Sequence, residues 1–148
     1  MTKSSIPKNI VFYADDDLDD LELVKEAFAQ YSKSVEVITA TDGSKALSHL
    51  SNLKKYDALP CLIILDINMP VINGKEVLLR LREMDHLLEV PVVLFSTSSQ
   101  PSDKSFAKRY NAGFITKPID VKQMSFIAEQ FIEHCTEEVK NKIREQMQ

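Results

Sequence analysis

The sequence has few of the residues on which several common kinds of site depend. Its two cysteines, Cys61 and Cys135, lie far apart and form no CxxC pair, so we expect neither a disulfide framework nor a zinc site. Its three glycines form no GxGxxG or GxxxxGK(S/T) motif, which disfavours a nucleotide-binding or flavodoxin-like module. With 18 basic and 22 acidic side chains, the net charge of -4 disfavours direct binding to nucleic acid or to an anionic membrane.

Long hydrophobic runs are also missing. The chain is polar up to Asn9, and the next apolar run, residues 10–14, is too short for the hydrophobic part of a signal peptide or for a membrane span. Together with the unpaired cysteines, this predicts a cytoplasmic protein. The length of 148 residues suits one domain with a full core. We expect a flexible N-terminus over residues 1–8, this domain over residues 9–135, and an extension of the last helix over residues 136–148.

Short apolar or β-branched runs of strand length recur along the chain. Three of them lack the polar alternation of a strand with one wet face, and such runs are typical of parallel strands covered on both faces. The intervals between the runs show helical spacing of apolar residues. Strand and helix thus alternate, which predicts an α/β fold with a doubly wound parallel sheet, right-handed crossovers and helices on both faces. The predicted strands are residues 10–14, 35–40, 61–65, 92–95 and 114–116, and helical spacing occurs over residues 18–28, 43–53, 77–81 and 101–110.

The last segment, residues 121–147, contains no glycine or proline and repeats apolar residues at helical spacing. One helix of this length would extend about 40 Å at about 1.5 Å per residue, well beyond a strand of about 17–20 Å. Its far end therefore needs a surface to cover it. The end either frays or folds back on the same domain, or it contacts a second copy or another partner through Val139, Ile143 and Met147.

Polar side chains follow four of the five predicted strands. The first strand runs into three consecutive acids that begin with Asp15 and Asp16, the third into Asp66, the fourth into Ser96 and the fifth into Lys117. Ligands of an open parallel sheet bind beyond the carboxyl ends of its strands, so we expect these side chains to share one cleft.

The acids near the first strand do not all have the same interpretation. Asp19 and Asp20 suit the N-terminal turn of a helix, where negative charge is stabilising, and we interpret them in that way. Asp15 and Asp16 could be part of the same helix start. We favour a site for this pair, because helix capping does not require the matching polar residues on the other strands.

The chemistry of these side chains predicts phosphoryl transfer. Asp15, Asp16 and Asp66 in one cleft would raise one another's pKa values unless a cation neutralised them, and Mg²⁺ binds carboxylates and phosphoryl oxygens together. Asp66 can be the nucleophile, because carboxylates form aspartyl-phosphates. Lys117 supplies a second cation and Ser96 a hydroxyl donor, which suits the charge that develops on the transferred group.

The same residues, in this order, resemble the response-regulator receiver family. An acid pair, an Asp-x-x-Met-Pro, a strand-end serine or threonine and a Lys-Pro at these intervals form a specific set, which spans roughly residues 9–135. The resemblance implies a flavodoxin-like strand order of 2-1-3-4-5. It also implies a phosphoacceptor switch rather than an enzyme, although one that assists its own phosphoryl transfer and dephosphorylation. The matching pieces are IVFYADDDLDD (10–20), ATDGSKAL (40–47), LIILDINMPVING (62–74), PVVLFS (91–96) and FITKP (114–118).

Taken residue by residue, the resemblance assigns roles around the metal and the phosphoryl group. It implies that Asp15 and Asp16 hold Mg²⁺ together with Asp66 and the backbone carbonyl of Asn68. Asp66 would accept the phosphoryl group from a sensor histidine kinase or a histidine phosphotransfer protein, and Lys117 would pair with that group.

The resemblance further implies a switch that follows phosphorylation. Ser96 corresponds to the switch hydroxyl, and Phe114 to the aromatic residue whose rotamer changes; phenylalanine in place of the commoner tyrosine leaves no hydroxyl there. Only 30 residues follow Pro118, so we expect output through a downstream protein target or through relay of the phosphoryl group.

A Mg²⁺-dependent phosphohydrolase with an aspartate nucleophile is the alternative function. Hydrolases of the haloacid-dehalogenase type carry Asp-x-Asp after their first strand. In this chain Asp66 follows the third predicted strand, and position 68 is Asn.

Overall fold

Five strands form one parallel sheet in a computed structural model that describes residues 7–54 and 57–147. Their order is β2-β1-β3-β4-β5, and all neighbouring pairs are parallel, so the doubly wound prediction and its strand order are confirmed. The strands are β1 (Asn9–Ala14), β2 (Val35–Ala40), β3 (Leu62–Asp66), β4 (Val92–Ser96) and β5 (Gly113–Thr116).

The register of the central strands brings their polar ends together. Every residue of β3 and β4 is buried, as their continuous apolar sequences predict. Asp66 of β3 pairs with Phe95 of β4, and Ser96 of β4 pairs with Thr116 of β5. Lys117 follows directly. The side chains at these carboxyl ends therefore lie along one edge of the sheet.

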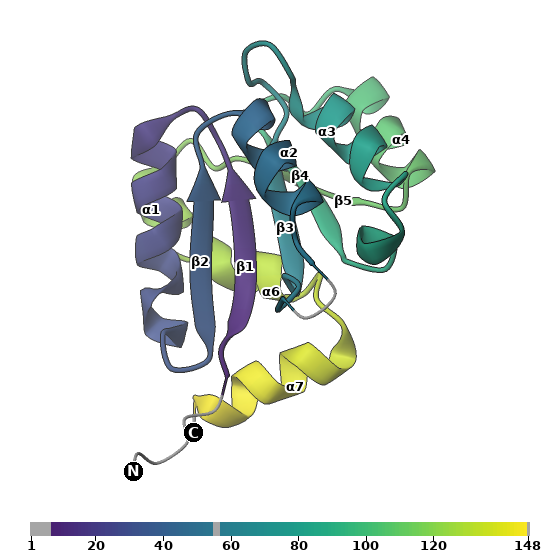
Figure 1. Cartoon of the computed structure of the whole chain (residues 1–148). Helices are drawn as coiled ribbons and strands as arrows, with labels where there is room; N and C mark the ends of the chain where they lie inside the picture. The colour runs from purple at the N-terminus through teal and green to yellow at the C-terminus, as the bar shows by residue number, and fades with distance from the viewer. Residues whose placement is uncertain (1–6, 55–56, 148) are drawn as a thin grey trace.

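Helices cover both faces of the sheet (Figure 1). On one face, α1 and the helices after β5 pack around buried aromatic residues such as Phe28, Phe95 and Phe131. On the other face, α2, α3 and α4 pack around Leu65 and Leu78. The helices before the C-terminal segment are α1 (Leu18–Phe28), α2 (Gly43–Ser51), α3 (Gly74–Leu81) and α4 (Pro101–Arg109), and the short 3-10 helices are η1 (Ala29–Tyr31) and η2 (Asp85–Leu87).

The C-terminal segment is broken, so the prediction of one helix over residues 121–147 was wrong. The structure has α5 (Val121–Met124), α6 (Ile127–Ile132) and α7 (Glu137–Gln146) instead. Thr136 caps α7 through its side chain, which accepts a hydrogen bond from the Val139 N–H, so α7 begins as a separate helix.

This break lets α7 fold back across the lower end of the sheet, near the start of β1 (Figure 1). Ile143 is fully buried in the core cluster on the α1 face, together with Cys135. Burial of this face offsets the cost of breaking the helix, because a fully exposed isoleucine would lose about 1.5–3 kcal/mol of transfer free energy. Of the two alternatives for the far end, folding back on the same domain is the one the structure shows.

The same packing covers part of the surface predicted to contact a second copy or another partner. Ile143 is fully buried within its own domain and Val139 is half-buried, whereas Met147 is 46% exposed. The contact itself stays a prediction. As far as residue 147, the predicted extension of the last helix over residues 136–148 is wrong, because α7 is a helix separate from α6. We predicted a flexible N-terminus over residues 1–8, and residues 1–6 of it lie outside the described residues.

Two further observations concern the cysteines and the helices. Cys61 and Cys135 are both free thiols, and Cys135 is buried. Within residues 7–54 and 57–147, none of the helices combines the length and apolar character that a membrane crossing requires.

Candidate functional site

The acids predicted to hold a metal do come together. Asp15, Asp16 and Asp66 each contribute a carboxylate oxygen to a group in which the oxygens lie within 4.8 Å of one another. Asp15 follows the last residue of β1 and Asp66 is the last residue of β3, which explains why residues 51 positions apart meet. Asp15 and Asp66 are buried, whereas Asp16 is exposed. The cluster thus opens to solvent on one side.

Lys117 is the cation of this site. Its Nζ lies 2.8 Å from Asp15 Oδ2, 2.8 Å from Asp20 Oδ2 and 3.4 Å from Asp66 Oδ1. The Lys117 backbone is fixed by a 2.7 Å hydrogen bond from its N–H to the Ser96 carbonyl. Burial alone would lower the pKa of Lys117, but the hydrogen bonds to Asp15 and Asp20 outweigh it and raise this pKa above its ordinary value.

Tyr13 is a site residue that the sequence analysis missed. Its hydroxyl donates a hydrogen bond to Asp15 Oδ2, and both side chains are fully buried. The Asp17 N–H donates to Asp15 Oδ1 at 2.9 Å. Burial, followed by the charge of Asp15, raises the pKa of Tyr13, so its hydroxyl keeps its proton and remains a donor. The available signal was spacing, because residues two apart on a strand point to the same face.

Asp20 has a second role beyond the helix start to which we assigned it. Its backbone N–H and that of Asp19 both donate to the side chain of Asp17, the N-cap of α1. The Asp20 side chain, however, turns toward the sheet edge and binds Lys117, while Asp19 is exposed. The interpretation of Asp20 as only a charge at the helix start was therefore wrong.

Asp66 has the environment of a carboxyl group that is costly to ionise. Its pKa is raised to about 7, first by burial and then by the charge of Asp15. Lys117 and the Asn68 N–H, which lies 3.4 Å from Asp66 Oδ1, act in the opposite direction. The carboxylate oxygens of this cluster are hard donors that fit a divalent cation, and such a cation would favour the ionised form of Asp66.

The loop after Asp66 is tightly constrained. The Gly74 N–H donates to the Ile67 carbonyl at 3.0 Å, which folds the loop back onto the end of β3. A Cβ atom on Gly74 would clash with the Asp66 carbonyl oxygen, so this close approach requires glycine. The exposed Val71 at the tip of the loop has a φ of 66°. The loop therefore fixes the direction of the Asp66 backbone.

The predicted switch residues lie on neighbouring strands. Ser96 is fully buried at the end of β4, and its Oγ accepts a 3.1 Å hydrogen bond from the Ser98 N–H. Phe114 of β5 is half-buried in the core cluster that α2, α3 and α4 share. Asn68 is exposed next to Asp66. The switching roles of Ser96 and Phe114 and the metal contact of the Asn68 carbonyl stay predictions.

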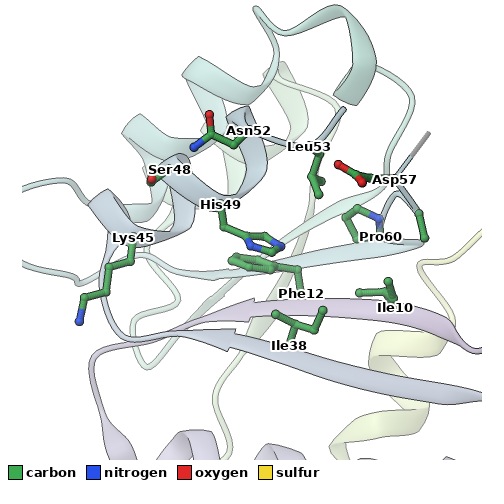
Figure 2. A pocket seen from close by; sticks show the side chains of 11 residues that line it. Ile10, Phe12, Ile38, Lys45, Ser48, His49, Asn52, Leu53, Asp57 and Pro60 are labelled. Carbon is green, nitrogen blue, oxygen red and sulfur yellow. The ribbon is translucent and has the colours of Figure 1, made fainter. Parts of the chain in front are cut away.

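A hollow of about 660 Å³ lies apart from this cluster, between α2 and the strands beside the β2 edge. Figure 2 shows its walls: Ile10 and Phe12 of β1, Ile38 of β2, and side chains of α2. The His49 ring stacks on Phe12 with their centroids 5.2 Å apart. Among the described residues that line this hollow, none belongs to the predicted site.

Comparison with known proteins shows the family to which the chain belongs. The family model described as the response regulator receiver domain matches residues 11–129. Response regulator Rcp1 of Synechocystis sp. is 30% identical over 128 residues, which are 84% of this chain and 86% of Rcp1. The chain is 33% identical to the probable transcriptional regulator ycf29 of Porphyra purpurea but spans only 48% of that protein.

Solved structures give the same result. The crystal structure of the phosphorylated cyanobacterial phytochrome response regulator RcpA has a TM-score of 0.78 at 31% identity, and the alignment covers 86% of this chain and 93% of that one. The Mn²⁺-bound form of Rcp1 has a TM-score of 0.75 at 28% identity, with coverage of 88% and 98%. The chain belongs to the response regulator receiver domain family. The resemblance seen in the sequence is therefore confirmed.

Proposed function

We propose that this chain is a phosphoacceptor switch of two-component signal transduction that carries its phosphoryl group on Asp66. The observation that carries the proposal is the position of the Asp66 carboxylate, which is buried at the end of β3 with the Lys117 Nζ 3.4 Å from its Oδ1. Membership in the receiver family supports the same function.

A Mg²⁺ ion would be held by the carboxylates of Asp15, Asp16 and Asp66 and by the backbone carbonyl of Asn68. When bound, it would supply positive charge to these carboxylates and to the phosphoryl oxygens. The all-oxygen donor set supports an ion of this class, as does the Mn²⁺-bound structure of Rcp1.

Asp66 acts as the nucleophile in its ionised form. One of its carboxylate oxygens forms the new P–O bond, while the P–N bond of a phosphohistidine donor breaks and the released imidazole takes up a proton. Lys117 favours the ionised form of Asp66 before transfer, because it counteracts the rise in pKa caused by burial and by Asp15. After transfer, the Lys117 ammonium lies beside the new phosphoryl group.

The switch step uses the neighbouring strands. Ser96 can rotate its hydroxyl proton toward a phosphoryl oxygen, and Phe114 follows by changing its packing against the α4 side of the core. The surface formed by α4, β5 and α5 would then change shape, which is a two-state response to a local charge. Output passes to a downstream protein target or, by relay, to a histidine on another protein.

The alternative of a phosphohydrolase is not favoured. The position of Asp66 at the end of the third strand, the asparagine at position 68 and the family match all point to a receiver.

The function is tested by incubating the protein with Mg²⁺ and acetyl phosphate and weighing it intact. We expect a single base-labile phosphoryl adduct that requires the metal and does not form when EDTA is present. Asp66→Asn should give no adduct. Asp85→Asn, which removes an exposed acid from η2, is the matched control and should be modified like the wild type. An equal adduct on Asp66→Asn would reject Asp66 as the acceptor.

A further inference from the structure

The three partners of Lys117 are not equivalent. A lysine ammonium has three N–H donors, and here three carboxylates lie within 4.0 Å of it. Asp15 and Asp20 are each 2.8 Å away, whereas Asp66 is 3.4 Å away. The longest of the three contacts is thus the one to the residue that carries the phosphoryl group in the proposed function.

Asp20 differs from the other two partners because it stands outside the metal cluster. Asp15 and Asp66 belong to the group of oxygens that could hold an ion, and Asp20 does not. Its backbone is fixed in the first turn of α1, where Asp17 binds its N–H. Within the described part of the chain, Lys117 is the residue that donates to its side chain. Lys117 is therefore the hydrogen-bonded partner at which the Asp20 carboxylate is directed.

A phosphoryl group on Asp66 brings several negatively charged oxygens to Lys117. Two of the lysine's three donors already point to carboxylates at short distance, so one donor is left for the phosphoryl oxygens, and any further contact must displace Asp15 or Asp20. A metal in the cluster would compensate Asp15 directly but leave Asp20 unchanged. Asp20 then remains as a counter-ion that competes for Lys117 and as a like charge near the phosphoryl group. Both effects weaken the hold of the site on the phosphoryl group.

We propose that Asp20 is a positioning residue that acts through Lys117 and limits how tightly the site holds a phosphoryl group. This inference rests on the proposed phosphoacceptor function. It gives the first turn of α1 a part in setting the lifetime of the phosphorylated state, since a weaker lysine contact leaves the acyl phosphate more exposed to hydrolysis.

The inference is tested by titrating the protein, in Mg²⁺, with beryllofluoride as a phosphoryl analogue and measuring the Kd by calorimetry. Asp20→Asn should bind about fivefold more tightly than wild type, the ratio that corresponds to the roughly 1 kcal/mol of a partly exposed ion pair. Its acetyl phosphate adduct should also decay more slowly. Asp20→Glu, which keeps the charge, should restore values near those of the wild type.

Asp19→Asn is the matched control, because it removes an exposed acid from the same helical turn without touching Lys117. Its Kd and decay rate should equal those of the wild type. Unchanged binding by Asp20→Asn would overturn the inference. Weaker binding would also overturn it and would mean that Asp20 holds Lys117 ready for the phosphoryl group. Asp20→Ser provides the same comparison if Asp20→Asn fails to fold. A wild type that binds no beryllofluoride would be a failure of the proposed function itself.

Discussion

Replacing Asp66 with asparagine should stabilise the metal-free protein at neutral pH and above. In the folded state the pKa of Asp66 is raised to about 7 from an ordinary value of 3.8, because the carboxyl is buried beside Asp15. The unfolded chain therefore releases this proton at a lower pH than the folded chain does. Ionisation of Asp66 thus destabilises the fold, and Asp66→Asn removes that ionisation while it keeps the size of the side chain.

The magnitude and its pH range follow from these two values. A raised pKa in the folded state contributes stability that is fully present below about pH 4 and is lost as the pH rises to about 7. One pH unit corresponds to about 1.4 kcal/mol, so the largest possible loss is about 4 kcal/mol. This pKa already includes the opposing effect of the Lys117 charge, so we expect a net gain for Asp66→Asn of at most about 4 kcal/mol at pH 8.

The assay is urea unfolding followed by circular dichroism, with EDTA present, between pH 4.5 and 8. The difference in free energy of unfolding between Asp66→Asn and wild type should grow with pH up to about 7 and then stay constant. Mg²⁺ should reduce this difference in free energy of unfolding, because it binds the folded wild type and stabilises it by mass action. Asp85→Asn should match wild type throughout. A difference independent of pH, or a wild type more stable than Asp66→Asn at pH 8, would refute the reasoning.

Three other variants, one of them with a matched control, test the supporting structure. Tyr13→Phe removes a buried hydrogen bond to a carboxylate, and urea unfolding should show a loss of about 1–3 kcal/mol in EDTA. Gly74→Ala places a methyl group against the Asp66 carbonyl. We expect the free energy of unfolding to fall by about 1–3 kcal/mol and the reaction with acetyl phosphate to become slower. An unchanged rate would show that the loop can move freely. Ile143→Ala should cost about 2–5 kcal/mol, whereas the exposed Met147→Ala should stay within about 0.5 kcal/mol of wild type if α7 is docked.

The parts of the fold that the sequence predicted are those with a continuous local signal. The buried strands at residues 62–66 and 92–96 are apolar up to their last residue, and the alternation with helices left few topologies open. The C-terminal segment shows the limit of such signals. No glycine or proline marks the breaks near Phe126 and between Glu133 and Thr136. The break before α7 is stabilised instead by the tertiary contact that buries Ile143 in the core. A tertiary contact of this kind has no counterpart in helical periodicity.

The residues of the site also differ in whether the sequence carries a local signal for them. Asp15, Asp66 and Lys117 could be predicted because each stands directly at a strand end, and strand order then brings them together. Tyr13 and Asp20 were not identified as site residues, since each has a complete local explanation, the first as a core residue of β1 and the second as an acid in the first turn of α1. Their second contacts depend on side-chain directions that only the assembled sheet edge determines.

The central claim is that Asp66 itself carries the phosphoryl group, and one measurement tests it most directly. Protein treated with Mg²⁺ and acetyl phosphate is reduced with borohydride, which converts an aspartyl-phosphate to homoserine, and peptide mass spectrometry then locates the converted residue. We predict homoserine at position 66 and nowhere else in the chain. Homoserine at Asp15 or Asp16, or no conversion in protein shown to be folded, would contradict this claim.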